Sequence, residues 1–239
     1  MATSRGPKSP ALELPFLAID PRCRQAQLFL GTCCSVTTGE RRAAAGRGTV
    51  ANMSNRGVIA GFQVKKAAQI AKWFVCKAGG KVEKLKLVKL FYFAEREYIT
   101  RHDEPMLYDE LYSLEHGPIC SSVLDGINGR PRPGRDWRSF DRDGKDLAYG
   151  GSCAREELDH LSDADIRVIE HVWDKFGWMT ASQLKNYAQE NCPEYQAVAA
   201  GIRAPIPYSD LYEAIGHPDP LAASDEVTRH RRRSAFFIA

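Results

Sequence analysis

Histidine and cysteine are the side chains from which a metal site or a nucleophilic active site would most readily be built in this chain. The six histidines share no motif with one another, and no GxSxG, HExxH or phosphate-binding glycine loop occurs. The seven cysteines are scattered and contain no CxxC pair, the spacing typical of zinc and redox sites. We therefore expect reduced cysteines, no metal, no cofactor and no enzymatic activity. The histidines are His102, His116, His160, His171, His217 and His230.

Glu95 is the one carboxylate whose position suggests more than a solvated charge. It falls on the apolar stripe that runs from Val88 to Tyr98 in a helix-like segment. A carboxylate buried on such a stripe needs a hydrogen-bonding partner. We expect Tyr112 or His116 to provide it, in a structural and not a catalytic role.

Arginines gather in the Pro- and Gly-rich segment 128–152, which also contains a tryptophan. A solvated loop is the simplest interpretation of such a composition. The alternative is a contact surface for a partner, with Trp137 as its anchor, since Trp and Arg dominate binding hot spots. Together with the aromatic segment before it, this loop predicts a set of partner-binding residues: Tyr108, Tyr112, His116, Arg132, Arg135, Trp137 and Arg138.

Two helical patterns precede these segments. Apolar residues recur at helical spacing over 64–78, and Gly79 and Gly80 end the pattern. Over 82–101 the apolar positions go almost all round the axis, which predicts a central helix packed on several sides. Its lysines, Lys84, Lys86 and Lys89, are expected to keep their ammonium groups in water while their stems lie on apolar surface.

The remaining elements are shorter. Residues 106–116 favour an extended or hairpin segment, and Pro118 suits the first position of a further helix. Ser162 and Thr180 begin capping patterns that predict helices over 163–176 and 181–191, and 208–215 predicts a last short helix. The fold class is therefore mainly α, or α+β with a small β-hairpin or short sheet, in a compact helical domain.

Composition divides the chain into three parts. Residues 1–52 are rich in Pro, Gly and Arg without regular periodicity, and we expect a disordered or mis-annotated N-terminal extension. Residues 53–216 form the predicted helical domain, and 217–239 a flexible tail. The extension carries a net charge of +4 and the rest of the chain −1, so the rest is near neutral. No apolar run could span a membrane. A cytoplasmic location is expected, and nucleic acid is not an expected partner.

Three segments together resemble the Panacea domain family. They are Lys84-Leu-Lys-Leu-Val-Lys-Leu-Phe-Tyr-Phe-Ala94, Pro105-Met-Leu107 and Glu115-His-Gly-Pro-Ile119. These correspond to the family's KLxKLLYFA helix, its xPL turn and its GP[VI] segment, and the similarity extends over about 62–200. The chain is most similar to the SocA-like antitoxins, but it lacks the Thr-His pair and the tryptophan that many members carry near 186–195.

The resemblance implies an antitoxin that binds and neutralises a cognate, SocB-like toxin. It further implies a proteolytic adaptor that hands the toxin to the ClpXP protease. The alternative is a DNA-binding transcriptional regulator that uses a helix-turn-helix-like pair at 163–190. That pair offers little positive charge for phosphate contacts, so protein binding is the leading hypothesis.

Overall fold

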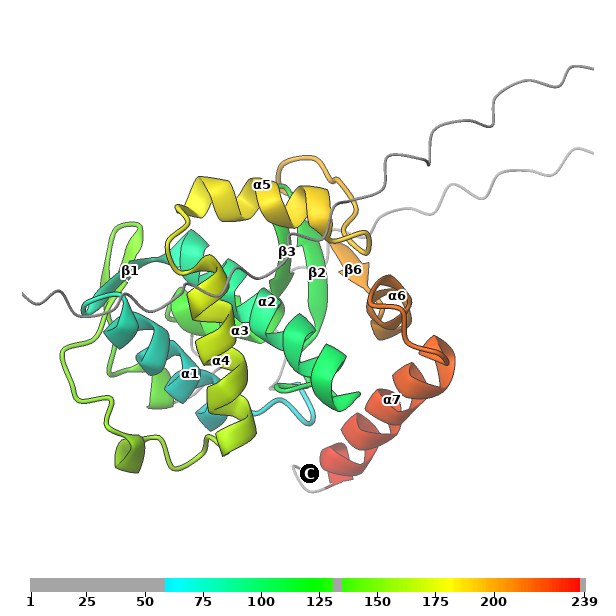
Figure 1. Ribbon diagram of the computed structural model, residues 1–239, viewed down its shortest axis with the longest axis horizontal. Helices are drawn as coiled ribbons and strands as arrows, with labels where there is room; N and C mark the ends of the chain where they lie inside the picture. The colour runs from blue at the N-terminus through cyan, green and yellow to red at the C-terminus, as the bar shows by residue number, and fades with distance from the viewer. Residues whose placement is uncertain (1–58, 131–134, 237–239) are drawn as a thin grey trace, which may run out of the picture. The chain divides into compact units, whose positions relative to one another are not determined.

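The structure is a computed structural model that describes residues 59–130 and 135–236 (Figure 1). It confirms a mainly helical α+β fold. The helices are α1 Val64–Lys77, α2 Lys84–His102, α3 Ser121–Ile127, α4 Asp163–Phe176, α5 Ala181–Asn191, α6 Tyr208–Ala214 and α7 Pro220–Phe236, with short 3₁₀ turns at Arg135–Trp137 and Arg155–Glu157. The strands are β1 Lys81–Glu83, β2 Leu111–Leu114, β3 Gly117–Cys120, β4 Asp141–Asp143, β5 Asp146–Ala148 and β6 Ala204–Ile206.

Helix α2 is the central element, as its all-round apolar pattern predicts. It contacts α3, α4, α5, β1 and β3, and a continuous run from Leu87 to Glu95 is buried (Figure 1). Phe93 stacks on Phe176 of α4 with 4.5 Å between ring centroids. The helix ends at Asp103, which takes the left-handed conformation and donates its N–H to the Ile99 carbonyl.

Two small antiparallel sheets flank the helices. Strand β2 lies between β3 and β6, and β5 lies between β1 and β4. The β2–β3 hairpin confirms the extended segment predicted from residue 106 onward. The prediction for Pro118 is wrong: this residue pairs with Ser113 inside β3, and α3 begins only at Ser121. Pro118 has no N–H to donate to a sheet, and it is tolerated here because β3 is the edge strand of its sheet.

The helices α4 and α5 begin as their capping patterns predict. The Ser162 hydroxyl accepts the Asp165 N–H while the Asp165 carboxylate accepts the Ser162 N–H, and Thr180 and Gln183 form the equivalent pair for α5. Gly177 joins the two helices, and Lys86 of α2 donates to its carbonyl at 2.5 Å. These local patterns were therefore sufficient to locate both helix starts.

The segment expected to be a flexible tail instead contains helix α7. Val227 is buried, and α7 packs against α6. The Arg231 guanidinium donates to the Tyr108 and Asp109 carbonyls, and His230 stacks on the Tyr108 ring at 3.8 Å. These side-chain contacts order α7 although its own sequence is strongly polar. The predicted extension 1–52 and residues 237–239 lie outside the described residues.

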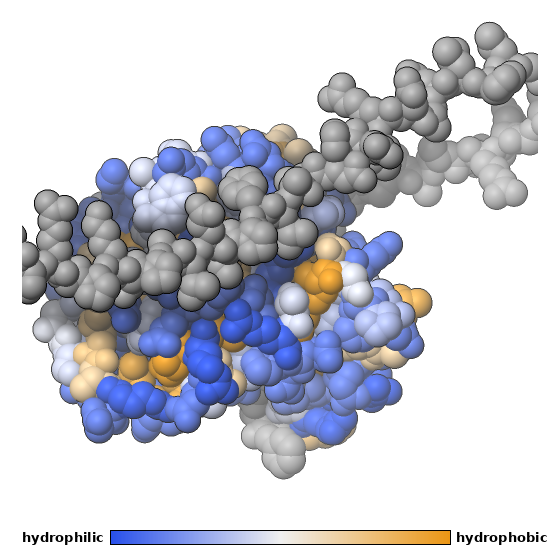
Figure 2. Space-filling model, in the orientation of Figure 1, coloured by the Kyte–Doolittle hydropathy of each residue, from blue (hydrophilic) through white to orange (hydrophobic). Residues whose placement is uncertain are grey.

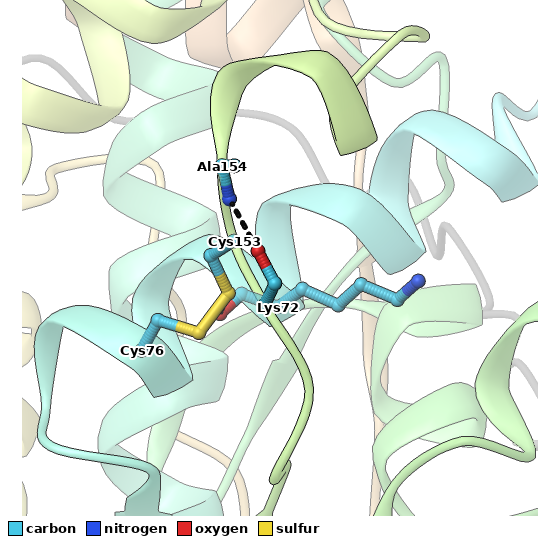
Figure 3. The surroundings of a disulfide bond; sticks show 5 residues. Lys72, Cys76, Cys153 and Ala154 are labelled. Atoms are coloured by element: carbon cyan, nitrogen blue, oxygen red, sulfur yellow. Dashed lines mark hydrogen bonds between the residues drawn. A yellow bond between two sulfur atoms is a disulfide. The ribbon is translucent and has the colours of Figure 1, made fainter.

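The expectation that all cysteines are reduced is wrong for two of them. Cys76 near the end of α1 is joined to Cys153 by a disulfide, although 77 positions separate them in the sequence (Figure 3). Neighbouring contacts hold the same segment against α1: Lys72 lies over the Tyr149 ring at 5.3 Å, and Gln69 donates to Asp159 at 2.6 Å. The pairing arises from this long-range packing, which no sequence spacing could indicate.

The surface is largely hydrophilic on the face that Figure 2 shows, with apolar residues in patches between polar ones. Across the described ranges, no helix combines the length and hydrophobicity that crossing a membrane would require. Within the same ranges, no three His, Cys, Asp or Glu side chains gather as metal ligands would.

Candidate partner-binding site

A groove of about 440 Å³ lies where the start of α2 meets the β2–β3 hairpin, α3 and the loop before β6. We call it the Lys89 groove, after the lysine that lines it. This volume falls within the range of ligand-binding pockets. Its walls are largely apolar, contributed by Leu85, Val88, Leu114, Ile119, Leu124 and Ile202.

Positive charge predominates among the polar residues of the Lys89 groove. Of the described side chains that line it, Glu115 is the one carboxylate, against several basic groups. Arg130 is paired with Asp125 at 2.7 Å, and Arg203 donates to the Ser121 hydroxyl at 3.0 Å. The groove therefore favours an apolar ligand that carries negative charge. Its basic residues are Lys84, Lys89, His116, Arg130 and Arg203.

Lys89 corrects the expectation that the α2 lysines keep their ammonium groups in water. Its side chain is fully buried, and its Nζ donates to the Pro118 carbonyl at 2.8 Å. A Cβ at Gly117 would lie 2.9 Å from that Nζ, so only glycine leaves room for the ammonium group. Burial lowers the pKa of Lys89 to about 7. The lysine of the helix motif and the Gly-Pro of the hairpin motif thus form a single contact.

One of the predicted partner-binding residues lies at this site: His116 is exposed and lines the Lys89 groove. Tyr112 is half-buried on β2 and is not one of the groove's lining residues, although the guanidinium of Arg203, which lines the groove, lies 4.0 Å from its ring centroid. Tyr108 lies elsewhere, stacked on His230 of α7. The segment 106–116 therefore divides between two surfaces.

The predicted arginine-rich contact surface does not include its anchor. Trp137 is only 2% exposed and packs against Gly126 of α3 and the ring of Phe140, so it belongs to the core. Arg135 and Arg138 are exposed, but they do not line the groove. Arg132 lies outside the described residues. The composition of segment 128–152 suggested a surface role for Trp137, while its packing gives it a structural role.

Lys89, Ile202 and Arg203 are among the groove residues that were not predicted as binding residues from the sequence. For Lys89 a signal existed, because it lies four residues after Leu85 and three before Tyr92 on an apolar helix face. Ile202 and Arg203 follow Gly201 in a connection whose sequence has no periodicity. Only the fold brings that connection to α2.

Glu95 is buried as its stripe predicts, but with other partners than expected. Its Oε2 accepts the Leu107 N–H at 3.0 Å, and its Oε1 lies 3.2 Å from the Tyr208 hydroxyl. The expected pair with Tyr112 or His116 is therefore wrong, since residues from the 105–107 turn and α6 reach the carboxyl instead. The Tyr208 hydroxyl also donates to the Asp109 carbonyl at 2.9 Å, so a protonated Glu95 can donate to Tyr208 in turn.

The two buried carboxyl groups of this region are expected to make stability depend on pH. Burial raises the pKa of Glu95 to about 7, and the Asp109 carboxylate nearby acts in the same direction. Burial raises the pKa of Asp109 to about 6 although backbone N–H donors at the start of α3 oppose it. A carboxyl group with a raised pKa binds its proton more tightly in the folded protein than in the unfolded chain.

We therefore predict that the contribution of Glu95 to stability is complete below its ordinary pKa of 4.5 and is lost as the pH rises towards about 7. The loss should be about 3 kcal/mol, at about 1.36 kcal/mol per pKa unit. Glu95→Gln keeps an acceptor for Leu107 and a donor for Tyr208. It should therefore reduce the dependence of the free energy of unfolding on pH. Urea denaturation between pH 4 and pH 8 measures it, with the exposed Glu170→Gln on α4 as control. A slope that survives Glu95→Gln would contradict the assignment.

Comparison with known proteins gives one family match. Residues 87–194 match the model of the family described as "Antitoxin SocA-like, Panacea domain", and the resemblance seen in the sequence motifs is thereby confirmed. The matched segment runs from the first turn of α2 to just beyond α5. No curated protein and no solved structure matches the chain.

Proposed function

Because residues 87–194 are a SocA-like Panacea domain, we propose that this protein is an antitoxin that binds and neutralises a cognate, SocB-like toxin. The family supports an antitoxin role in a toxin–antitoxin system and a non-enzymatic regulator. The finer proposal is direct binding of the toxin protein, followed by its delivery to the ClpXP protease. Such an adaptor works by raising the concentration of its cargo at the protease.

The single observation that carries the toxin-binding proposal is the Lys89 groove. A concave, mostly apolar surface with a few fixed charges is the kind of site that binds another molecule. Ile202 at its edge is 52% exposed and adds to the apolar surface that the groove offers to a partner. His116 lines the same groove, and the ring of Tyr112 contacts Arg203, another of its lining residues. We propose that the toxin contacts this rim.

The test is co-purification of the full chain with the product of the adjacent gene. Ile202→Asp introduces a charge into the groove and should weaken toxin binding by about tenfold or more, since a buried unpaired charge opposes association. Leu221→Asp is the matched control, because Leu221 is also exposed, at 72%, but lies on α7 away from the groove. Equal binding by both variants, or no co-purification at all, would contradict the proposal.

The adaptor role has its own readout in the same system. Purified ClpXP should degrade the toxin faster when the wild-type antitoxin is present than when it is absent, and Ile202→Asp should remove that difference. This role requires a cytoplasmic location, which we propose with it. Toxin binding without accelerated degradation would limit the function to neutralisation.

The alternative of a DNA-binding regulator rests on α4 and α5. Both helices are present, but α5 carries one basic residue, Lys185, which is half-buried, and an exposed Glu190 at its end. Phosphate contacts require more positive charge than this. Salt-sensitive binding of its own promoter by the purified protein would favour the alternative over toxin binding.

A further inference from the structure

Lys89 is a buried amino group with no matching carboxylate among the described residues. Its ammonium group has three N–H donors, and the Pro118 carbonyl accepts from it at 2.8 Å. Among the residues that the structure describes, no carboxylate forms an ion pair with it. A buried ammonium group is costly unless it is paired. The unused donors of Lys89 therefore favour a bound anion.

The surroundings of Lys89 restrict the chemistry of that anion. Leu85 and Val88 precede it on the same helix, and Ile119 and Leu124 line the same groove. A phosphate ion could meet the basic residues of the groove, but it would leave these apolar walls uncovered. A carboxylate attached to an apolar group satisfies both parts of the site, because the charge meets Lys89 while the apolar part fills the groove.

We propose that the Lys89 groove binds the C-terminal residue of a partner protein, with its α-carboxylate at Lys89 and its apolar side chain against Leu85, Ile119 and Ile202. An apolar C-terminal residue carries the carboxylate and the side chain on one carbon, so both enter a cavity of this size together. An internal Asp or Glu offers a carboxylate but has no large apolar side chain to fill the groove. Capture of a terminal carboxylate is a known mode of peptide recognition. The protein occupant rests on the proposed function, which makes this chain a binder of another protein.

The test compares two forms of one six-residue peptide that ends in Leu-Ile, one with a free terminal carboxylate and one with a terminal amide. Calorimetry with the full chain should show the free acid binding about tenfold or more tightly, since a charge-assisted hydrogen bond is lost in the amide. Lys89→Met should reduce the affinity for the acid to that for the amide. Lys86→Met is the matched control, because Lys86 lies on the same helix but donates to Gly177 outside the groove.

A second measurement guards against loss of folding in Lys89→Met. In the wild-type protein, NMR of the lysine side chains should show the pKa of Lys89 rising when the free acid binds and staying unchanged with the amide, because an adjacent carboxylate favours the charged ammonium. Equal affinities for acid and amide, or an unchanged Lys89 pKa with the acid, would overturn the carboxylate site.

Octanoate, a free acid with an apolar tail, distinguishes the occupant. Lys89-dependent binding of octanoate with no binding of either peptide would overturn the protein occupant and assign the groove to a small organic acid. None of these measurements uses the toxin. Toxin co-purification combined with equal peptide affinities would therefore reject this inference alone, and Lys89-dependent peptide binding without any toxin complex would reject the proposed function alone.

Discussion

Trp137→Ala is expected to lower the free energy of unfolding by about 4 kcal/mol, the largest effect of any substitution considered for this protein. The indole is 2% exposed, and its ring lies so close to Gly126 that a Cβ there would be 2.5 Å from the indole Cε2. Phe91 and Phe140 complete its surroundings, with ring centroids at 6.5 Å and 5.6 Å. Alanine would leave a cavity that these rigid neighbours cannot close.

Urea denaturation followed by circular dichroism measures this effect, with Trp178→Ala as the matched control. Trp178 is 72% exposed at the turn between α4 and α5, so the same substitution there should change stability by less than about 0.5 kcal/mol. If Trp137→Ala kept its stability but no longer bound the partner protein, Trp137 would instead be the surface anchor that the composition of segment 128–152 suggested. Trp137→Phe should cost less than alanine, partly because the indole Nε1 has no hydrogen-bond partner among the described residues.

Opening the disulfide between Cys76 and Cys153 is expected to lower the free energy of unfolding by up to about 4 kcal/mol. The bond closes a loop of 77 residues, and the chain-entropy estimate of its stabilisation grows with loop length. Because Cys153 belongs to the segment after β5, the loss should be accompanied by faster hydrogen exchange of 149–161 than of α2. The contacts of Lys72 with Tyr149 and of Gln69 with Asp159 would remain to hold part of this segment.

Denaturation with and without dithiothreitol measures the contribution of the bond. The double substitution Cys76→Ser with Cys153→Ser is the control: it should match the reduced wild-type protein and no longer respond to the reductant. Equal stability of the oxidised and reduced wild-type protein would contradict a stabilising role. Disulfides are rare in a reducing cytoplasm. For the cytoplasmic antitoxin that we propose, the reduced protein is therefore the form in which toxin binding should also be measured.

Local sequence patterns accounted for most of the helical architecture. The starts of α4 and α5 could be predicted from Ser162 and Thr180, because a capping box involves residues only three positions apart. The central position of α2 followed from apolar residues all round its axis. The short strands β1, β4, β5 and β6 were not predicted, since each has three residues and too little alternation to be distinguished from a loop.

The candidate site was predicted less completely. His116 lines the Lys89 groove, but other parts of the groove come from Lys89 and from Ile202 and Arg203, more than a hundred residues apart in the chain. The sequence suggested that Trp137 lies on the surface and that the Lys89 ammonium group lies in water. In the folded protein both side chains are buried. Whether such a side chain is buried depends on which distant segments cover it, and a pattern of near neighbours does not contain that information.

The sequence by itself therefore determined the helices, their caps and the Panacea motifs, because these depend on contacts within one or two turns of the chain. It predicted a helix start at Pro118, whereas Gly117 and Pro118 lie in β3. Only the tertiary structure decided that this glycine and proline enclose the Lys89 ammonium, that Cys76 meets Cys153, and that α7 packs on the domain. Those contacts join residues that are distant along the chain, and burial in the folded core is what selects them.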